Sequence, residues 1–241
     1  MVEALNFSVV DPSWQACLKR GLATVDPHYL QSLVSLYNWL PGPQKIFNAF
    51  SLPLSQVNYV LFGESPYPRQ QSANGYAFWD NDVHDLWSAK GLSKQVNRAT
   101  SLRNIIKMLL ITEDLLTPDN TTQEAIANLD KSKLVQTNEE FFNNLLKHGF
   151  LLLNTSLVLQ EQAPMKDAKA WAPFMSELLD CLLEHRPEAT FILFGKIANT
   201  LQSILHHKPI NVLCSEHPYN LSFITNPDIL DFFRPLHLLR K

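Results

Sequence analysis

The chain lacks features that would mark it as a strongly basic, secreted or membrane-bound protein. Its 20 lysines and arginines are outnumbered by 23 aspartates and glutamates, which gives a net charge of −3. Any contact with nucleic acid must therefore come from a local cationic patch rather than from the field of the whole molecule. No apolar stretch is long enough to cross a bilayer, and the first residues do not pair a basic segment with an apolar one. We therefore expect a cytoplasmic protein with no membrane association.

Cysteine is also scarce. Cys17, Cys181 and Cys214 are far apart in the sequence and form no C-x-x-C pair. This spacing argues against a zinc site, an iron–sulfur cluster and a disulfide framework. We expect no metal and no cofactor, in keeping with a reducing compartment.

Hydrophobic residues make up 46% of the 241 residues, which is ample for a large core. We expect a single domain over residues 1–241. Helical spacing predicts two helices within residues 12–39, broken near Pro27, and further helices over 101–112, with Ser101 as the cap, and over 173–185. A capping box at 137–140 opens another helix, and residues 117–136 are predicted to be a loop. Apolar runs at about 57–62, 148–154, 191–195 and 211–214 predict four strands, and their alternation with helices predicts a parallel sheet.

Polar side chains follow three of these strands at the point where each strand ends. They are Glu64, Ser65 and Tyr67 after the first, Asn154 after the second and His217 after the last. Ligands of open parallel sheets bind outside the carboxyl ends of the strands. The sequence therefore predicts that these side chains converge on one pocket.

Several motifs occur in a fixed order along the chain. They are GESPYP at 63–68, GYAF at 75–78, SLRNI at 101–105, LLLN at 151–154 and HPYNLS at 217–222. This series resembles the uracil-DNA glycosylase superfamily, and most closely its family 1 enzymes, in which the first, second and last motifs read GQDPYH, GLAF and HPSPLS. The resemblance covers nearly the whole chain. It implies a three-layer α/β/α fold with a central four-stranded parallel sheet, and a monomeric enzyme of base excision repair.

The resemblance also implies how a base would be held. A glycosylase must bury its flipped base and read the base edge by hydrogen bonds. By the resemblance, Phe78 stacks on the ring, and Asn154 donates to uracil O4 and accepts from N3–H, a pattern that cytosine reverses. Tyr67 occupies the position that crowds uracil C5 and excludes the methyl group of thymine.

Cleavage of the N-glycosidic bond leaves negative charge on the departing base. His217 resembles the histidine that stabilises this anion at O2, and free uracil would be the product. Leu221 resembles the apolar wedge that fills the gap in the duplex. The other positions that the resemblance assigns to DNA binding are Ser101, Lys196, Tyr219, Asn220 and Ser222.

The hydrolytic position departs from the family pattern. Ser65 stands where the family has its water-activating aspartate, and a positioned general base is worth roughly 10²–10⁴-fold in rate. Glu64 is the only carboxylate inside this motif that could substitute. The expected substrate is therefore uracil, or a related damaged pyrimidine, in DNA, with the base that activates water unassigned.

Two alternatives from other classes remain open. The chain could be a catalytically weak or inactive module that binds DNA or a protein partner, because a fold survives the loss of its site. A serine hydrolase with Ser65 as nucleophile is the other alternative, although G-E-S-P-Y lacks the G-x-S-x-G of a nucleophile elbow. Likewise, Lys94, Arg98 and Arg103 could contact phosphates or could simply form a solvated helix face.

Overall fold

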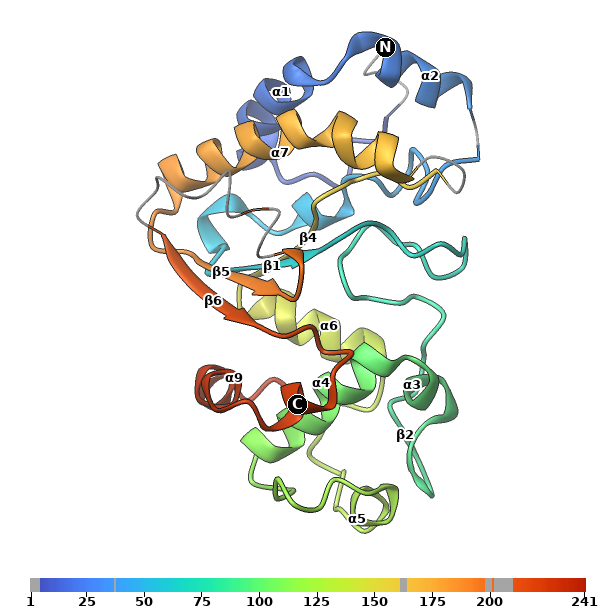
Figure 1. Ribbon diagram of the computed structural model, residues 1–241, viewed down its shortest axis with the longest axis vertical. Coiled ribbons are helices and arrows are strands. Elements are labelled where there is room, and N and C mark those ends of the chain that lie inside the picture. The colour runs from blue at the N-terminus through green and yellow to red at the C-terminus, as the bar shows by residue number, and fades with distance from the viewer. Residues whose placement is uncertain (1–4, 37, 161–163, 198–200, 202–209) are drawn as a thin grey trace. The chain divides into compact units, whose positions relative to one another are not determined.

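The computed structural model describes residues 5–36, 38–160, 164–197, 201 and 210–241 (Figure 1). The chain divides into two compact units. Unit 1 comprises Met1–Asp80, Gly149–Ile192 and Thr200–Val212, and unit 2 comprises Asn81–His148, Leu193–Asn199 and Leu213–Lys241. Among the described residues, no helix combines the length and apolarity needed to cross a membrane.

The central sheet has four strands in the order β4-β1-β5-β6. They are β1 (Tyr59–Gly63), β4 (Phe150–Asn154), β5 (Thr190–Phe194) and β6 (Asn211–Ser215), close to the ranges predicted from the apolar runs. Strand β1 pairs in parallel with β4 and with β5. This is the predicted four-stranded parallel sheet with flanking helices.

The helices of unit 1 are α1 (Gln15–Thr24), α2 (Pro27–Ser35) and α7 (Pro164–His185). Pro27 is the first residue of α2, where its fixed φ suits a helix start and no N–H is needed. Helix α7 begins nine residues earlier than predicted and keeps Pro173 inside it, so the prediction of a helix start at that proline was wrong. Figure 1 shows α1 and α7 side by side.

A disulfide joins these two helices. Cys17 of α1 and Cys181 of α7 are both fully buried and are bonded, with their Cα atoms 5.5 Å apart. The expectation of unpaired cysteines was therefore wrong for this pair, because helix packing brings together residues that lie 164 positions apart. Arg20, one turn along α1, forms ion pairs with Glu177 and Glu184 of α7.

Unit 2 contains α3 (Lys94–Arg98), α4 (Thr100–Thr112), α5 (Gln123–Ala127), α6 (Asn138–Lys147), α9 (Pro227–Phe233) and the short antiparallel pair β2 (Trp87–Ser88) and β3 (Gly91–Leu92). The capping box of Thr137 and Glu140 is present at the start of α6, as predicted. Helix α5 lies in the segment predicted to be a loop, where the Thr122 hydroxyl caps its first turn. Helix α4 begins at Thr100 after Ala99, so Ser101 is not its cap.

Candidate active site

The carboxyl ends of β1 and β4 lie side by side in unit 1. Gly63 pairs with Asn154 at the last position of the register. A Cβ on residue 63 would overlap Asn154 Oδ1 and would lie 2.9 Å from the Cβ of Ala77. Residue 63 must therefore be glycine for the Asn154 carboxamide to lie against the backbone of β1.

Asn154 has an unusual environment for a buried polar side chain. It is only 3% exposed, yet its carboxamide forms no hydrogen bond with any residue that the structure describes. The carboxamide atoms of Asn154 are not fully enclosed, so solvent or a ligand can reach them. A ligand that offers one donor and one acceptor would satisfy this amide.

The segment that carries Phe78 is fixed to the edge of the sheet. The Ala77 N–H donates to the Leu152 carbonyl of β4 at 3.1 Å. Gly75 has a φ of +89° and packs on the Lys45 carbonyl, so a side chain there would overlap that backbone. Phe78 itself has a φ of +62°, a region that bulky residues rarely occupy and that often marks a functional site.

Tyr67 is held beside Phe78. Its hydroxyl donates to the Phe78 carbonyl at 3.1 Å. Burial, and then the nearby Asp80 carboxylate, raise the pKa of Tyr67 above its ordinary range, so the phenol stays neutral. Asp80 is buried and pairs with Arg69 at 3.0 Å. Tyr67, Phe78 and Asn154 therefore come from neighbouring segments of one unit.

The loop between β1 and Tyr67 is anchored through its backbone. The Thr155 and Ser156 N–H groups donate to the carbonyls of Gly63 and Glu64, at 2.9 and 3.0 Å. The Thr155 hydroxyl also donates to the Glu64 carbonyl. The Glu64 side chain is exposed and that of Ser65 is half-buried. The backbone at Gly63 and Glu64 is therefore positioned without use of the Glu64 side chain.

His217 lies in unit 2, at the end of the segment that follows β6. Its Nδ1 accepts a hydrogen bond of 3.1 Å from the Tyr219 N–H. An Nδ1 that accepts this hydrogen bond carries no proton, so the proton of the ring is on Nε2. Gly195 lies directly behind it, because a Cβ there would come within 2.9 Å of the His217 Cβ.

Asn104, which was not predicted to be a site residue, holds the turn that follows His217. This residue of α4 is fully buried, and its Nδ2 donates to the carbonyl of Pro218 at 2.7 Å. Nδ2 also lies 3.5 and 3.4 Å from the carbonyls of Tyr219 and Asn220. The sequence signals were its place in the SLRNI motif and its position on the apolar side of an amphipathic helix.

The exposed part of this turn carries the predicted wedge. Leu221 is 70% exposed and Tyr219 is 67% exposed, while the following Phe223 is fully buried against the Phe194 ring. A buried anchor directly behind an exposed leucine gives that leucine a fixed base.

The remaining predicted DNA contacts lie in the same unit. Burial would raise the pKa of Glu216, but hydrogen bonds from Ser222, the Glu216 backbone and Asn226 lower it. Ser222 is exposed. Asn220 and Lys196 are exposed, and Ser101 is the second residue of α4.

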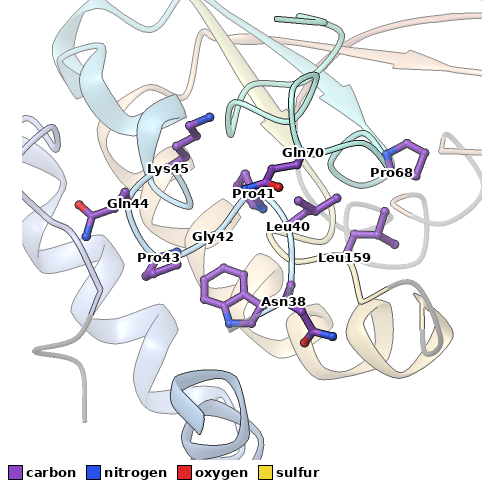
Figure 2. A pocket seen from close by; sticks show the side chains of 11 residues that line it. Asn38, Leu40, Pro41, Gly42, Pro43, Gln44, Lys45, Pro68, Gln70 and Leu159 are labelled. Atoms are coloured by element: carbon purple, nitrogen blue, oxygen red, sulfur yellow. The ribbon is translucent and has the colours of Figure 1, made fainter. Parts of the chain in front are cut away.

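Unit 1 contains a cavity of about 570 Å³, and Figure 2 shows the side chains that line it. It is lined by residues 38–45 together with Pro68, Gln70 and Leu159, and none of the predicted site residues lines it. The cavity is connected to the predicted site residues by sequence, because its lining residue Pro68 directly follows Tyr67. The structure thus places one group of predicted residues within each unit: Tyr67, Phe78 and Asn154 in unit 1, and His217 with the exposed Leu221 in unit 2.

These features define an open parallel α/β protein whose polar residues lie where the strands end. Residues 51–236 match the family model described as the uracil DNA glycosylase superfamily. The chain therefore belongs to the uracil-DNA glycosylase superfamily.

Similar proteins agree with this assignment. The wild-type UNG from Nitratifractor salsuginis, a crystal structure, is 39% identical with a TM-score of 0.94, over 99% of this chain and 96% of that one. Uracil-DNA glycosylase 2 of Bacteroides fragilis is 31% identical over 80% of this chain and 75% of its own length. The uracil-DNA glycosylase of Pseudomonas fluorescens is 28% identical over 88% of this chain and 82% of its own length. The mimivirus uracil-DNA glycosylase, at 18% identity and a TM-score of 0.60, shares the fold.

Proposed function

We propose that this protein is a uracil-DNA glycosylase that flips uracil out of DNA and hydrolyses its N-glycosidic bond in base excision repair. The relatives named above carry this activity in their names, and they match the chain over most of their own length. The products are free uracil and an abasic site.

The unpaired carboxamide of Asn154 is the observation that carries this proposal. A buried amide with one donor side and one acceptor side matches the O4 and N3–H edge of uracil. Phe78 would stack on the ring and Tyr67 would limit the space at C5. The strained φ of Phe78 and its hydrogen bond from Tyr67 support this use.

The leaving group would be stabilised by His217. As C1′–N1 breaks, negative charge develops on the uracil oxygens, and a preorganised donor aimed at that charge stabilises the transition state. Because Nδ1 accepts from the Tyr219 N–H, Nε2 would be the donor to this anion. We propose that Leu221 fills the space that the base leaves, and that Ser101, Lys196, Tyr219, Asn220 and Ser222 contact the DNA.

Glu64 and Ser65 mark the hydrolytic position. Ser65 cannot carry the negative charge of the family aspartate, and the exposed Glu64 is the carboxylate next to it. We propose that water attacks C1′ at this position. The proton of this water passes to Glu64 or to solvent. Stabilisation of the leaving uracil anion makes cleavage of the C1′–N1 bond faster than in DNA without the protein. We further propose that both units act as one catalytic domain, in a cytoplasmic monomer.

The test is single-turnover release of uracil, with protein in excess, from single-stranded DNA and from a mismatched duplex. We expect release by the wild type, and a loss of about 10²–10³-fold for His217→Ala, the typical effect of removing one such donor. Asn154→Ala should also lose activity, whereas Asn143→Ala, a change of a half-buried asparagine on α6, should not.

The absence of an aspartate at position 65 favours one rival, a DNA-binding module without catalysis. It would bind the DNA in this assay and release no base, and that result would overturn the proposed activity. Glu64→Gln distinguishes proton transfer to Glu64 from proton transfer to solvent. The uracil-release rate of this variant should fall only if Glu64 accepts the proton of the attacking water.

A further inference from the structure

Helix α4 is buried on nearly all sides and exposes one narrow stripe. Between Leu102 and Thr112, nine of the eleven residues are buried. The other two, Arg103 and Lys107, are half-buried. These two residues are one helical turn apart, so their Cβ atoms lie about 5–6 Å from each other. The stripe is therefore a pair of neighbouring cations.

No carboxylate neutralises this pair within the part of the chain that the structure describes. Arg103 donates to two neutral oxygens, the Asn97 carbonyl at 3.1 Å and Asn104 Oδ1 at 3.3 Å. Lys107 has neither a hydrogen bond nor an ion pair there. Burial and the Arg103 charge lower the pKa of Lys107. An anion placed between the two side chains would relieve this repulsion.

The pair is also linked to the turn that carries the wedge. Arg103 binds Oδ1 of Asn104, and Nδ2 of the same amide binds the Pro218 carbonyl. An anion bound at Arg103 would therefore lie one side chain away from the His217–Leu221 turn. Helix α3, which packs against α4, adds Lys94 and Arg98, and neither forms an ion pair with a described residue.

We propose that Arg103 and Lys107 form a phosphate-binding subsite for the DNA backbone, next to the His217–Leu221 turn. It rests on the proposed function, which supplies the polyanionic ligand. The subsite provides the local cationic patch that a chain with a net charge of −3 requires. Lysine and arginine bind phosphates regardless of base sequence, so the subsite would position the strand and not select the base.

The test is the salt dependence of DNA binding. The affinity for a uracil-free oligonucleotide is measured as a function of salt concentration for the wild type and Lys107→Gln. Each lost phosphate contact reduces the slope of log affinity against log salt by about 0.9 on duplex DNA and about 0.7 on a single strand. Lys107→Gln should show this reduction, and Arg103→Lys, which keeps the charge, should largely preserve the slope.

The matched controls are Lys133→Gln and Lys147→Gln, which remove the same charge from exposed positions of unit 2. A slope for Lys107→Gln equal to the wild type, or equal falls in all three lysine variants, would overturn the subsite. Uracil release is measured on the same proteins. A wild type that releases no uracil but shows the selective change in slope would refute the proposed activity and leave the subsite standing. Normal release without that change would refute the subsite alone.

Discussion

Gly63→Ala should disable the site while leaving the fold in place. The new methyl group would overlap Asn154 Oδ1 and would lie 2.9 Å from the Cβ of Ala77. Ala77 is fixed by its hydrogen bond to β4, so the carboxamide has to move. Relieving the overlap requires a shift of about 1 Å, and a misplacement of this size can cost about 10²-fold in rate. We therefore expect single-turnover uracil release to fall by about 10²-fold.

The stability cost needs a matched control, because adding a methyl group to a packed core typically costs about 1–3 kcal/mol. Gly21→Ala supplies it. A Cβ there would lie 2.8 Å from the Phe174 ring, so this variant also adds a methyl group to a tightly packed position of the same unit, between α1 and α7. Both variants should melt at a lower temperature, but only Gly63→Ala should lose activity below its melting point. Wild-type release by folded Gly63→Ala would refute the role of the carboxamide.

Four further results are expected. Ser65→Asp should raise the single-turnover rate by up to about 10²–10⁴-fold, the usual contribution of a general base, and an unchanged rate would show that water is activated elsewhere. Asn104→Ala should lower uracil release from duplex DNA, because it removes the hydrogen bond that holds the Pro218 carbonyl. The loss should be smaller when Leu221 is already changed to alanine. Fully additive effects of the two substitutions would contradict a role of Asn104 in positioning Leu221. Reduction of the Cys17–Cys181 disulfide, or Cys17→Ser, should lower the free energy of unfolding by up to about 5 kcal/mol, measured by urea denaturation. The reason is that the disulfide restricts the unfolded chain by closing a loop with a sequence separation of 164. Burial and Asp80 raise the pKa of Tyr67 above its ordinary 10.0, so the folded protein keeps the phenol proton to higher pH than the unfolded chain does. The free energy of unfolding should therefore fall as the pH rises beyond about 10. The fall should be smaller in Tyr67→Phe.

Local patterns predicted the parallel sheet and the order of its helices well. Four apolar runs and the Thr137 capping box are short-range features, and each was found close to its predicted position. That Gly63 and Asn154 end at the same edge of the sheet also follows from the sequence, whereas their direct pairing depends on the strand order, which was not predicted.

Contacts between distant residues were not predictable. The disulfide depends on how α1 packs against α7, and two cysteines with no motif around them give no signal of it. The role of Asn104 depends on three carbonyls more than a hundred residues later in the chain. Helix α7 extends through Pro173 because the helix is held by its packed apolar side, from Trp171 to Leu182.

The most direct test is a crystal structure of the protein with uracil bound. We expect one uracil molecule with its O4 and N3–H at the Asn154 carboxamide, its ring on Phe78 and its O2 at Nε2 of His217. Uracil bound at Asn154 with the His217 ring out of reach of O2, or uracil bound only in the cavity beside Pro68, would contradict the account.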